Sequence, residues 1–131
     1  METYLIEICL MKKPIEVIFL SQAEEFVDSL EDKARRKLFQ AIRKTKERLI
    51  GQWFTKLTGS DGIYEFRVDE GGKFYRLFAF WDSDNSRETL IVGTHGLVKK
   101  NNKIPNEEIR KAERIKREYF EKKRGNQGKK K

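Results

Sequence analysis

The sequence contains a single cysteine, Cys9, and a single histidine, His95, among its 131 residues. One cysteine excludes an internal disulfide framework and is typical of a reducing compartment, so we expect a cytoplasmic protein. One histidine and one cysteine are too few for a zinc-type ligand set, and we expect neither a metal nor another cofactor. No apolar run approaches the ~20 residues of a membrane-spanning helix, and the apolar segment near the start is too short and too acidic for a secretory signal, so we expect no membrane association.

Most common catalytic motifs are also missing. No glycine-rich phosphate loop precedes a predicted helix, because the stretches at 59–62 and 69–73 are typical of turns. The acidic residues form no obvious paired-carboxylate motif, and no neighbour of Cys9 marks it as a nucleophile. The sequence therefore does not indicate an enzyme that uses a phosphate-binding loop, a pair of catalytic carboxylates or a cysteine nucleophile.

Positive charge, in contrast, is abundant and concentrated near the end of the chain. The net charge is +8, and residues 99–131 hold 14 Lys and Arg against 5 Glu, whereas residues 1–98 hold 15 basic against 16 acidic residues. Such asymmetry favours an anionic partner, and nucleic acid is a better candidate than a membrane because no aromatic-rich amphipathic anchor accompanies the charge. The alternative is a solvated, solubilising segment.

The length and the 11% of aromatic residues predict one compact domain rather than a disordered chain. We place this single domain at residues 1–124. Residues 1–10 would be an extension if translation starts at Met11, and residues 125–131 form a basic flexible tail.

The apolar pattern predicts an α+β fold that starts with a strand and two helices. Residues 15–20 are β-branched and aromatic, as in a strand. Ser21 and Glu24 have the spacing of a capping box for a first helix. A second amphipathic helix starts at Asp32 and ends near Gly51, where glycine suits a left-handed stop, so the two helices form an αα-hairpin.

After Gly51 the pattern changes to strands joined by turns. Short strands are expected at 53–57, 63–70, 73–82 and 88–98, and the third is apolar on both faces, as in the centre of a sheet. Pro105 suits the first turn of a final helix, which should end after Arg124. The whole is an N-terminal strand with an αα-hairpin, an antiparallel sheet of about four strands and a C-terminal helix.

The turn at Gly71 and Gly72 fixes a register between two of these strands. If these glycines are the whole hairpin loop, Arg67 lies directly opposite Arg76. Opposed arginines repel each other by a few tenths of a kcal/mol or more unless an anion lies between them. Either an anionic ligand binds there, or Glu65 or another nearby acid neutralises the pair.

Cations on these strands and on the following loop form the candidate site. They are Arg67, Arg76, His95, Lys99, Lys100 and Lys56. Such a set suits RNA cleavage without a metal, because RNA supplies its own 2′-hydroxyl nucleophile. Guanidinium groups would stabilise the anionic transition state, and a histidine with an ordinary pKa near 6.5 could transfer a proton.

Three stretches resemble a known family: GIYEFRV at 62–68, KFYRLFAF at 73–80 and GTHGLVKKNNKIPNEEIRKA at 93–112. Their order and spacing resemble the phage-derived Gp49-like/HigB branch of the RelE/ParE toxin superfamily over roughly residues 14–120. The resemblance implies a compact RelE-like fold. It also implies a type II toxin that cleaves mRNA on the ribosome without a metal and is neutralised by an antitoxin, often a small helix-turn-helix protein encoded downstream.

Matched position by position, the resemblance makes Arg67, Arg76, His95, Lys99 and Lys100 the catalytic residues. Lysines and aromatic residues nearby would bind the RNA: Lys56, Lys73, Lys103 and Tyr75. Further candidates for stacking on a base are Tyr64, Trp53 and Trp81. Core packing is the alternative for each aromatic residue, and a structural hydrogen bond is the alternative for His95. Where relatives often have Thr-Gln-Lys-Thr-Pro, this chain has residues 101–105 as Asn-Asn-Lys-Ile-Pro, which removes a threonine cap before the last helix.

We therefore expect a metal-independent, ribosome-dependent mRNA endonuclease with an antitoxin partner. One alternative is a ParE-like toxin that inhibits a topoisomerase without nuclease activity. The other is a catalytically inert nucleic-acid-binding subunit.

Overall fold

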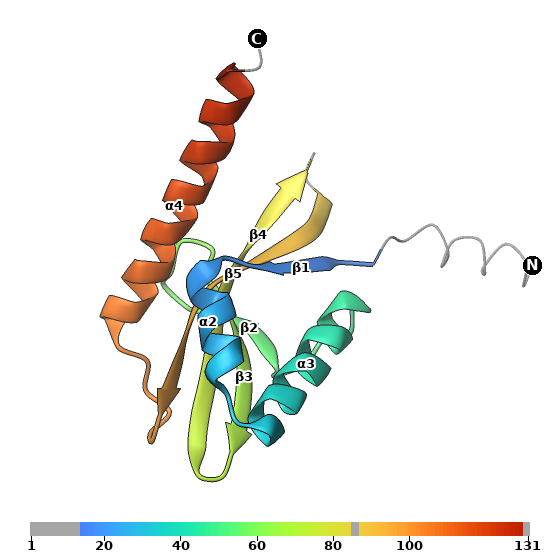
Figure 1. Ribbon diagram of the computed structural model, residues 1–131, viewed down its shortest axis with the longest axis vertical. Helices are drawn as coiled ribbons and strands as arrows, with labels where there is room; N and C mark the ends of the chain where they lie inside the picture. The colour runs from blue at the N-terminus through green and yellow to red at the C-terminus, as the bar shows by residue number, and fades with distance from the viewer. Residues whose placement is uncertain (1–13, 85–86, 130–131) are drawn as a thin grey trace, which may run out of the picture.

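A computed structural model of the chain describes residues 14–84 and 87–129 (Figure 1). The expected extension at 1–10, with Cys9, and the alternative start Met11 lie outside these residues. The elements follow the order β1 (Glu16–Phe19), α2 (Ser21–Ser29), α3 (Asp32–Lys46), β2 (Phe54–Lys56), β3 (Tyr64–Glu70), β4 (Lys73–Asp84), β5 (Arg87–Lys99) and α4 (Asn106–Lys129).

The five strands form one mixed sheet with the order β1-β5-β4-β3-β2. Strands β2 to β5 pair antiparallel, and β1 is added to β5 in a parallel orientation. This confirms the expected α+β class, the antiparallel sheet of about four strands and the central place of residues 73–82. The hairpin register is confirmed as well, because Glu70 pairs with Lys73, and Gly71 and Gly72 both have positive φ angles, as a two-residue hairpin loop requires.

The helix ends differ from the expectation. Ser21 is already inside α2, Leu20 occupies the N-cap position, and no side chain caps the helix, so the capping box does not form. Helix α3 ends at Lys46, and the residue with a left-handed conformation is Arg48, with a φ of 65°, rather than Gly51. The reason for glycine at position 51 is space: a Cβ there would lie 2.0 Å from the ring of Trp53.

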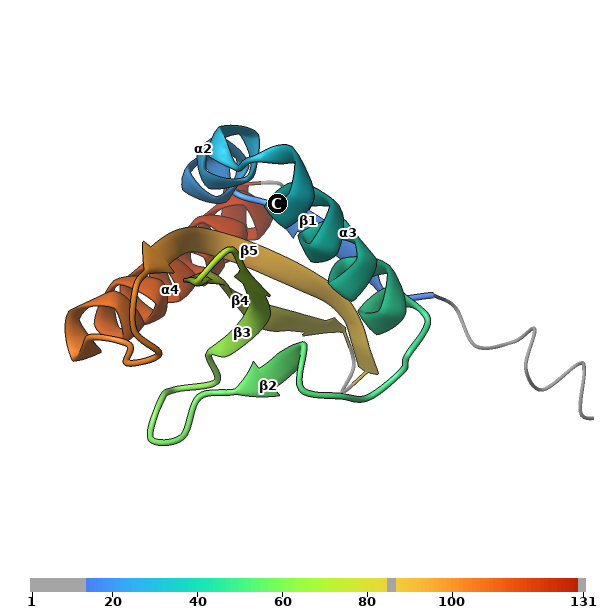
Figure 2. The same ribbon diagram turned by 90° about the horizontal axis from the view of Figure 1, so that it is seen from below.

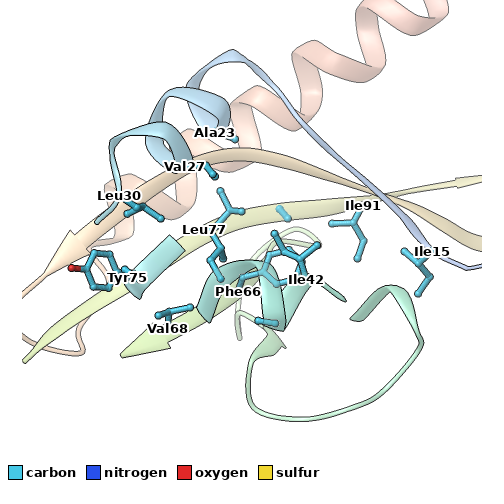
Figure 3. Packing of buried hydrophobic residues seen from close by; sticks show 14 residues of the cluster. Ile15, Ala23, Val27, Leu30, Ile42, Phe66, Val68, Tyr75, Leu77 and Ile91 are labelled. Atoms are coloured by element: carbon cyan, nitrogen blue, oxygen red, sulfur yellow. The ribbon is translucent and has the colours of Figure 1, made fainter. Parts of the chain in front are cut away.

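Alternation along the strands gives the sheet two apolar faces. Helices α2 and α3 cover one face, where Phe66, Tyr75 and Leu77 belong to one buried cluster (Figures 2 and 3). Helix α4 covers part of the other face through a second cluster that includes Phe78, Phe80 and Ala112. At about 1.5–3 kcal/mol for each fully buried large apolar side chain, the two clusters supply the main driving force for folding.

Polar contacts hold α4 against the last part of the central strand β4 and against the loop before β3. The buried carboxylate of Asp82 accepts hydrogen bonds from the Tyr119 hydroxyl, at 2.7 Å, and from Lys123 Nζ, at 2.9 and 3.0 Å. The backbone N–H of Asp61 donates to Glu113 at 2.7 Å. These contacts fix which part of the sheet α4 covers and which part it leaves open.

Helix α4 continues through Lys129, so the expected end of the helix after Arg124 is wrong. A glycine costs a helix about 1 kcal/mol but ends it only when it adopts a left-handed conformation, and Gly125 is not among the residues with positive φ. Among the described residues, no helix is both long and apolar enough to cross a membrane.

Candidate functional site

Arg67 on β3 lies directly opposite Arg76 on β4, as the hairpin register predicts. The carboxylate of Glu65 lies between them: Oε1 is 3.6 Å from Arg67 Nε, and Oε2 is 3.9 Å from Arg76 Nε. All three side chains lie on the face of the sheet that α4 covers in part, because they alternate with the core residues Phe66, Val68 and Tyr75. The alternative in which Glu65 neutralises the arginine pair is therefore the one that the structure adopts.

Arg76 is buried, with 1% of its surface exposed, and both terminal nitrogens of its guanidinium group donate hydrogen bonds within the chain. Nη1 donates to the carboxylate of Asp69 at 3.0 Å and to the carbonyl of Tyr75 at 2.9 Å, and Nη2 donates to Asn102 Oδ1 at 2.6 Å. In this arrangement the Arg76 guanidinium group faces groups of the chain itself and not solvent, so its expected contact with a phosphate stays a prediction. Arg76 acts on the site by holding Glu65, Asp69 and the loop after β5.

Arg67 is the accessible member of the pair. About a third of its side chain is exposed, and the ion pair with Glu65 is made through Nε. Among the described residues, no hydrogen bond or ion pair engages its terminal nitrogens. A guanidinium group held at one end and open at the other is suited to a phosphate oxygen.

The Glu65 carboxyl group is buried beside two arginines, and its pKa is raised from the ordinary value. Burial raises the pKa of Glu65, while the charges of Arg76 and Arg67 lower it by a smaller amount. Its Oε2 atom is buried and has no hydrogen-bond partner in the part of the chain that the structure describes. A carboxyl group with a raised pKa and an unsatisfied oxygen is a common property of functional sites.

Lysines from the end of β5 adjoin this cluster. Lys99 pairs with Phe74, and Phe74 pairs with Asp69, so these three residues form the next row on the same face of the sheet as Arg67 and Arg76, two residues along the strands. Asp69 and Lys99, at the two ends of this row, are separated by two strand spacings, or about 10 Å. Lys100 and Lys103 follow in the exposed connection to α4. In Figure 1 the end of β5 and the β3–β4 hairpin project beyond the first turn of α4, so this helix does not cover that end of the face.

His95 lies on the same face but under α4, with 3% of its surface exposed. Its Nε2 atom is 2.8 Å from Glu108 Oε2, and its Nδ1 atom is 3.1 Å from Thr94 Oγ1. Burial lowers the pKa of His95 more than the Glu108 carboxylate raises it. These contacts hold the buried ring between Thr94 and Glu108, as in the structural alternative, and do not present it to solvent as a proton shuttle.

Three residues expected to bind RNA do not join the cluster. Tyr75 has 5% of its surface exposed and packs in the core beside Val68 and Leu30 (Figure 3), so it cannot stack on a base. Lys73 and Lys56 are exposed, but their positions in the pairs with Glu70 and Tyr64 direct them to the opposite face of the sheet. The structure thus brings together Arg67, Arg76 and Lys99, with Lys100 and Lys103 nearby, and leaves the other three apart.

Three residues of this site are not among those predicted from the sequence. Asp69 and Asn102 hold Arg76, and Glu108 holds His95. The alternation of residues 65–69 contained a signal for Asp69, because it falls on the same face as Arg67. Nothing in the pattern indicated Asn102, which lies 26 residues after its partner. In the described part of the chain, no three His, Cys, Asp or Glu side chains are grouped as metal ligands.

Most of the chain matches a known protein family. Residues 25–117 match the family described as phage-derived protein Gp49-like (DUF891). The chain belongs to the Gp49-like family. The match spans all three stretches that carry the resemblance, together with the arginine pair, His95 and the lysines after β5. No curated protein matches the sequence.

Solved structures of toxins and toxin–antitoxin complexes are similar to this Gp49-like chain at low identity. The toxin–antitoxin complex RelBE2 from Mycobacterium tuberculosis has 18% identity and a TM-score of 0.49, over 67% of this chain and 94% of that chain. A mutant of the E. coli toxin RelE in the free state has 18% identity and a TM-score of 0.48, over 66% and 83% of the two chains. The intact E. coli RelBE toxin–antitoxin complex has 19% identity and a TM-score of 0.47, over 68% and 99%.

Proposed function

We propose that this chain is the toxin of a type II toxin–antitoxin system and acts as a metal-independent, ribosome-dependent mRNA endonuclease. Membership of the Gp49-like family supports the toxin assignment. The observation that carries the nuclease assignment is the buried Glu65 carboxylate, which lies within 4 Å of two opposed arginines, one of which, Arg67, is partly exposed.

In the proposed reaction, Glu65 accepts the proton of the RNA 2′-hydroxyl. The 2′-oxygen attacks the adjacent phosphorus, and the bond from phosphorus to the 5′-oxygen breaks. A general base works best when its pKa is close to the operating pH, and burial raises the pKa of Glu65 in that direction. The products are a 2′,3′-cyclic phosphate, which can open to a 3′-phosphate, and a 5′-hydroxyl.

Arg67 supplies the charge that the transition state needs. Its exposed end can contact the phosphate oxygens, which gain negative charge as the 2′-oxygen attacks. In the structure the Arg67 guanidinium group pairs with Glu65 Oε1. When Arg67 turns toward a phosphate instead, Glu65 Oε1 becomes accessible to the RNA 2′-hydroxyl. Loss of one such donor costs on the order of 10²–10³ in rate in comparable sites.

The remaining charged residues position the site and the RNA. Lys99, Lys100 and Lys103 bind phosphates of the RNA backbone, and the Lys99 ammonium group or water gives a proton to the leaving 5′-oxygen. Arg76 and His95 are positioning residues: Arg76 holds Glu65, and His95 joins β5 to the first turn of α4 through Glu108.

We propose an antitoxin as the cellular partner, with a small helix-turn-helix protein as the expected type. An antitoxin that covers the end of the sheet face that α4 does not cover would have to neutralise the lysines after β5. An acidic segment is suited to this because complementary charge speeds association and selects the partner.

The experiment that tests the function is to map breaks in mRNA on purified ribosomes, with the chain freed of antitoxin and a metal chelator present. Breaks that appear with the chelator, and that carry a cyclic or 3′-phosphate and a 5′-hydroxyl, support the proposal. Intact mRNA with a correctly folded chain overturns it.

The burial of Arg76 and His95 favours a second candidate, in which the fold binds its target without cleaving RNA. The target would be a topoisomerase, as for ParE-like toxins, or nucleic acid bound by an inert subunit. Intact mRNA together with a stalled topoisomerase identifies the former, and intact mRNA with an unaffected topoisomerase identifies the latter.

A further inference from the structure

An open recess of about 190 Å³ adjoins Arg67 at the edge of the sheet. It is lined by Gln52, Trp53, Arg67 and Asp69. Strand β2 pairs with β3 only as far as Phe66, so the β3 edge beyond that point is covered by the loop before β2 instead of by a strand. The backbone N–H of Arg67 donates to the carbonyl of Trp53 at 2.9 Å, which fixes this loop beside the arginine.

The Trp53 wall of the recess is held firmly in place. Its ring lies against Gly51, where a Cβ would meet three ring atoms at 2.0 to 2.5 Å, so only glycine leaves room for it. The ammonium group of Lys44 lies 4.7 Å from the ring centroid, in a cation–π contact. The indole N–H is buried and has no hydrogen-bond partner among the described residues, which makes it an unusual group in a packed protein.

The other walls offer hydrogen-bonding groups of complementary kinds. Asp69 is held through Oδ1 by Arg76, yet 63% of its side chain is exposed, so the carboxylate can accept further hydrogen bonds. Arg67 is a donor, and the exposed amide of Gln52 is both donor and acceptor. The recess therefore combines a carboxylate acceptor, a guanidinium donor and an amide that can do both around a volume of about 190 Å³.

We propose that this recess binds a guanine base of the RNA, on the nucleotide whose phosphate contacts Arg67. The inference rests on the proposed nuclease function, since it assigns the base specificity of that same site. Guanine presents two adjacent donors, N1–H and the N2 amino group, which match the Asp69 carboxylate. It also presents the acceptors O6 and N7, which match Arg67 or the Gln52 amide.

The same groups reject the other bases. Adenine presents an acceptor at N1 where guanine has a donor, so its lone pair would face the Asp69 carboxylate. Cytosine has an acceptor at N3. Uracil has a carbonyl oxygen on each side of its single donor, N3–H. Both bases are also smaller than the recess. A lone pair opposite a carboxylate costs binding free energy, so discrimination comes from repulsion as well as attraction.

Binding of mononucleotides tests the proposal without requiring cleavage. The probes are 3′-GMP, 3′-AMP, 3′-CMP and 3′-UMP, titrated against the folded chain in a Trp81→Phe background, so that the fluorescence reports on Trp53. We expect 3′-GMP to bind at least about tenfold more tightly than the other three, as one good bidentate contact allows. Equal affinity for the four nucleotides, or no binding, overturns the inference.

Variants of the recess connect the preference to its residues. Asp69→Asn should reduce the preference for 3′-GMP about tenfold or more, and Gln52→Ala should weaken 3′-GMP binding while leaving the fold, by circular dichroism, unchanged. Asp28→Asn, a matched change of an exposed acid on α2, should alter neither. A guanine preference that survives both recess variants places the base elsewhere and overturns the inference.

The outcome is separable from that of the proposed function. If ribosome-bound mRNA is cleaved with no enrichment of guanine at the cut, and Asp69→Asn leaves the pattern of cuts unchanged, the recess inference fails and the nuclease proposal stands. If 3′-GMP binds selectively but mRNA stays intact, the recess inference stands and the nuclease proposal fails.

Discussion

Arg67 and Arg76 lie opposite each other on neighbouring strands, and one carboxylate, that of Glu65, lies within 3.6 Å of the first and 3.9 Å of the second. The two arginines are unequal, because Arg76 is buried and bound by Asp69 and Asn102, whereas Arg67 reaches the surface. A buried charge fixed by several partners supports the fold, and an exposed charge is available to a ligand. This inequality determines what substitutions at the two positions should do.

Replacing Arg76 should chiefly damage stability. Arg76→Ala leaves the buried Glu65 carboxylate without its main counter-ion and also frees Asn102, which together should lower the free energy of unfolding by about 3–5 kcal/mol. Urea unfolding followed by circular dichroism measures this. Arg36→Ala, on the exposed face of α3, is the matched control and should change stability by less than about 0.5 kcal/mol. Equal effects in the two variants would show that the network around Arg76 contributes nothing.

Stability should fall in mild acid because of His95. Burial lowers the pKa of the folded ring below its ordinary value of 6.5, with Glu108 opposing and with Lys111 and Arg114 reinforcing the shift. The unfolded chain therefore binds a proton near pH 6.5 that the folded chain binds only at lower pH. The contribution of the neutral His95 ring to the free energy of unfolding is therefore fully present above pH 6.5, and it is lost as the pH falls through the folded pKa.

His95→Gln isolates that contribution. The free energy of unfolding, measured by urea titration from pH 7.5 to pH 5, should fall more steeply for the wild type than for the variant, which cannot take up the extra proton. A wild-type curve parallel to that of the variant would contradict the pKa shift of His95.

RNA binding should depend on salt through the lysines after β5. Each phosphate contact that is lost lowers the slope of log K against log salt concentration by about 0.7 for single-stranded RNA. Lys99→Ala and Lys100→Ala should each reduce the slope by about this amount. Lys56→Ala is the control because its side chain is directed to the opposite face. A reduction at Lys56 equal to that at Lys99 would place the RNA on a different surface.

The contact between Tyr119 and Asp82 should hold the second half of α4. Burial, the hydrogen bond to Asp82 and the charge of Asp82 raise the pKa of Tyr119 to about 12, so an absorbance titration should show one phenol that stays neutral until near that pH. Tyr119→Phe removes one donor from a buried carboxylate and should cost about 1–3 kcal/mol in urea unfolding. Tyr64→Phe, which removes a hydroxyl at a position away from α4, should cost less; an equal cost would argue against the clamp.

The sequence was sufficient for features that local chemistry determines. Gly71 and Gly72 specify a two-residue loop, and that loop fixes the pairing of Arg67 with Arg76 through simple counting. The alternating and fully apolar runs likewise identify the strands, including the central one. Each of these depends on neighbours within a few residues in the chain.

Features that depend on distant neighbours could not be predicted in this way. Burial of Arg76 requires Asn102 to fold back over it, and burial of His95 requires the first turn of α4 to cover β5. Gly51 is explained by the ring of Trp53 rather than by the helix end, because the tertiary contact outweighs the local preference. Asn102 lies within residues 101–105, the segment where this chain departs from the family pattern. From the sequence, that departure indicated only the loss of a helix cap, but in the structure the segment supplies a hydrogen-bond partner of the buried Arg76.

The measurement that tests the central claim most directly is the single-turnover rate of mRNA cleavage on purified ribosomes by the wild type, Arg67→Ala and Lys56→Ala, at equal folded concentration. If Arg67 stabilises the transition state beside Glu65, Arg67→Ala should cleave on the order of 10²–10³ times more slowly, and Lys56→Ala should match the wild type. Cleavage by Arg67→Ala at the wild-type rate would contradict the account.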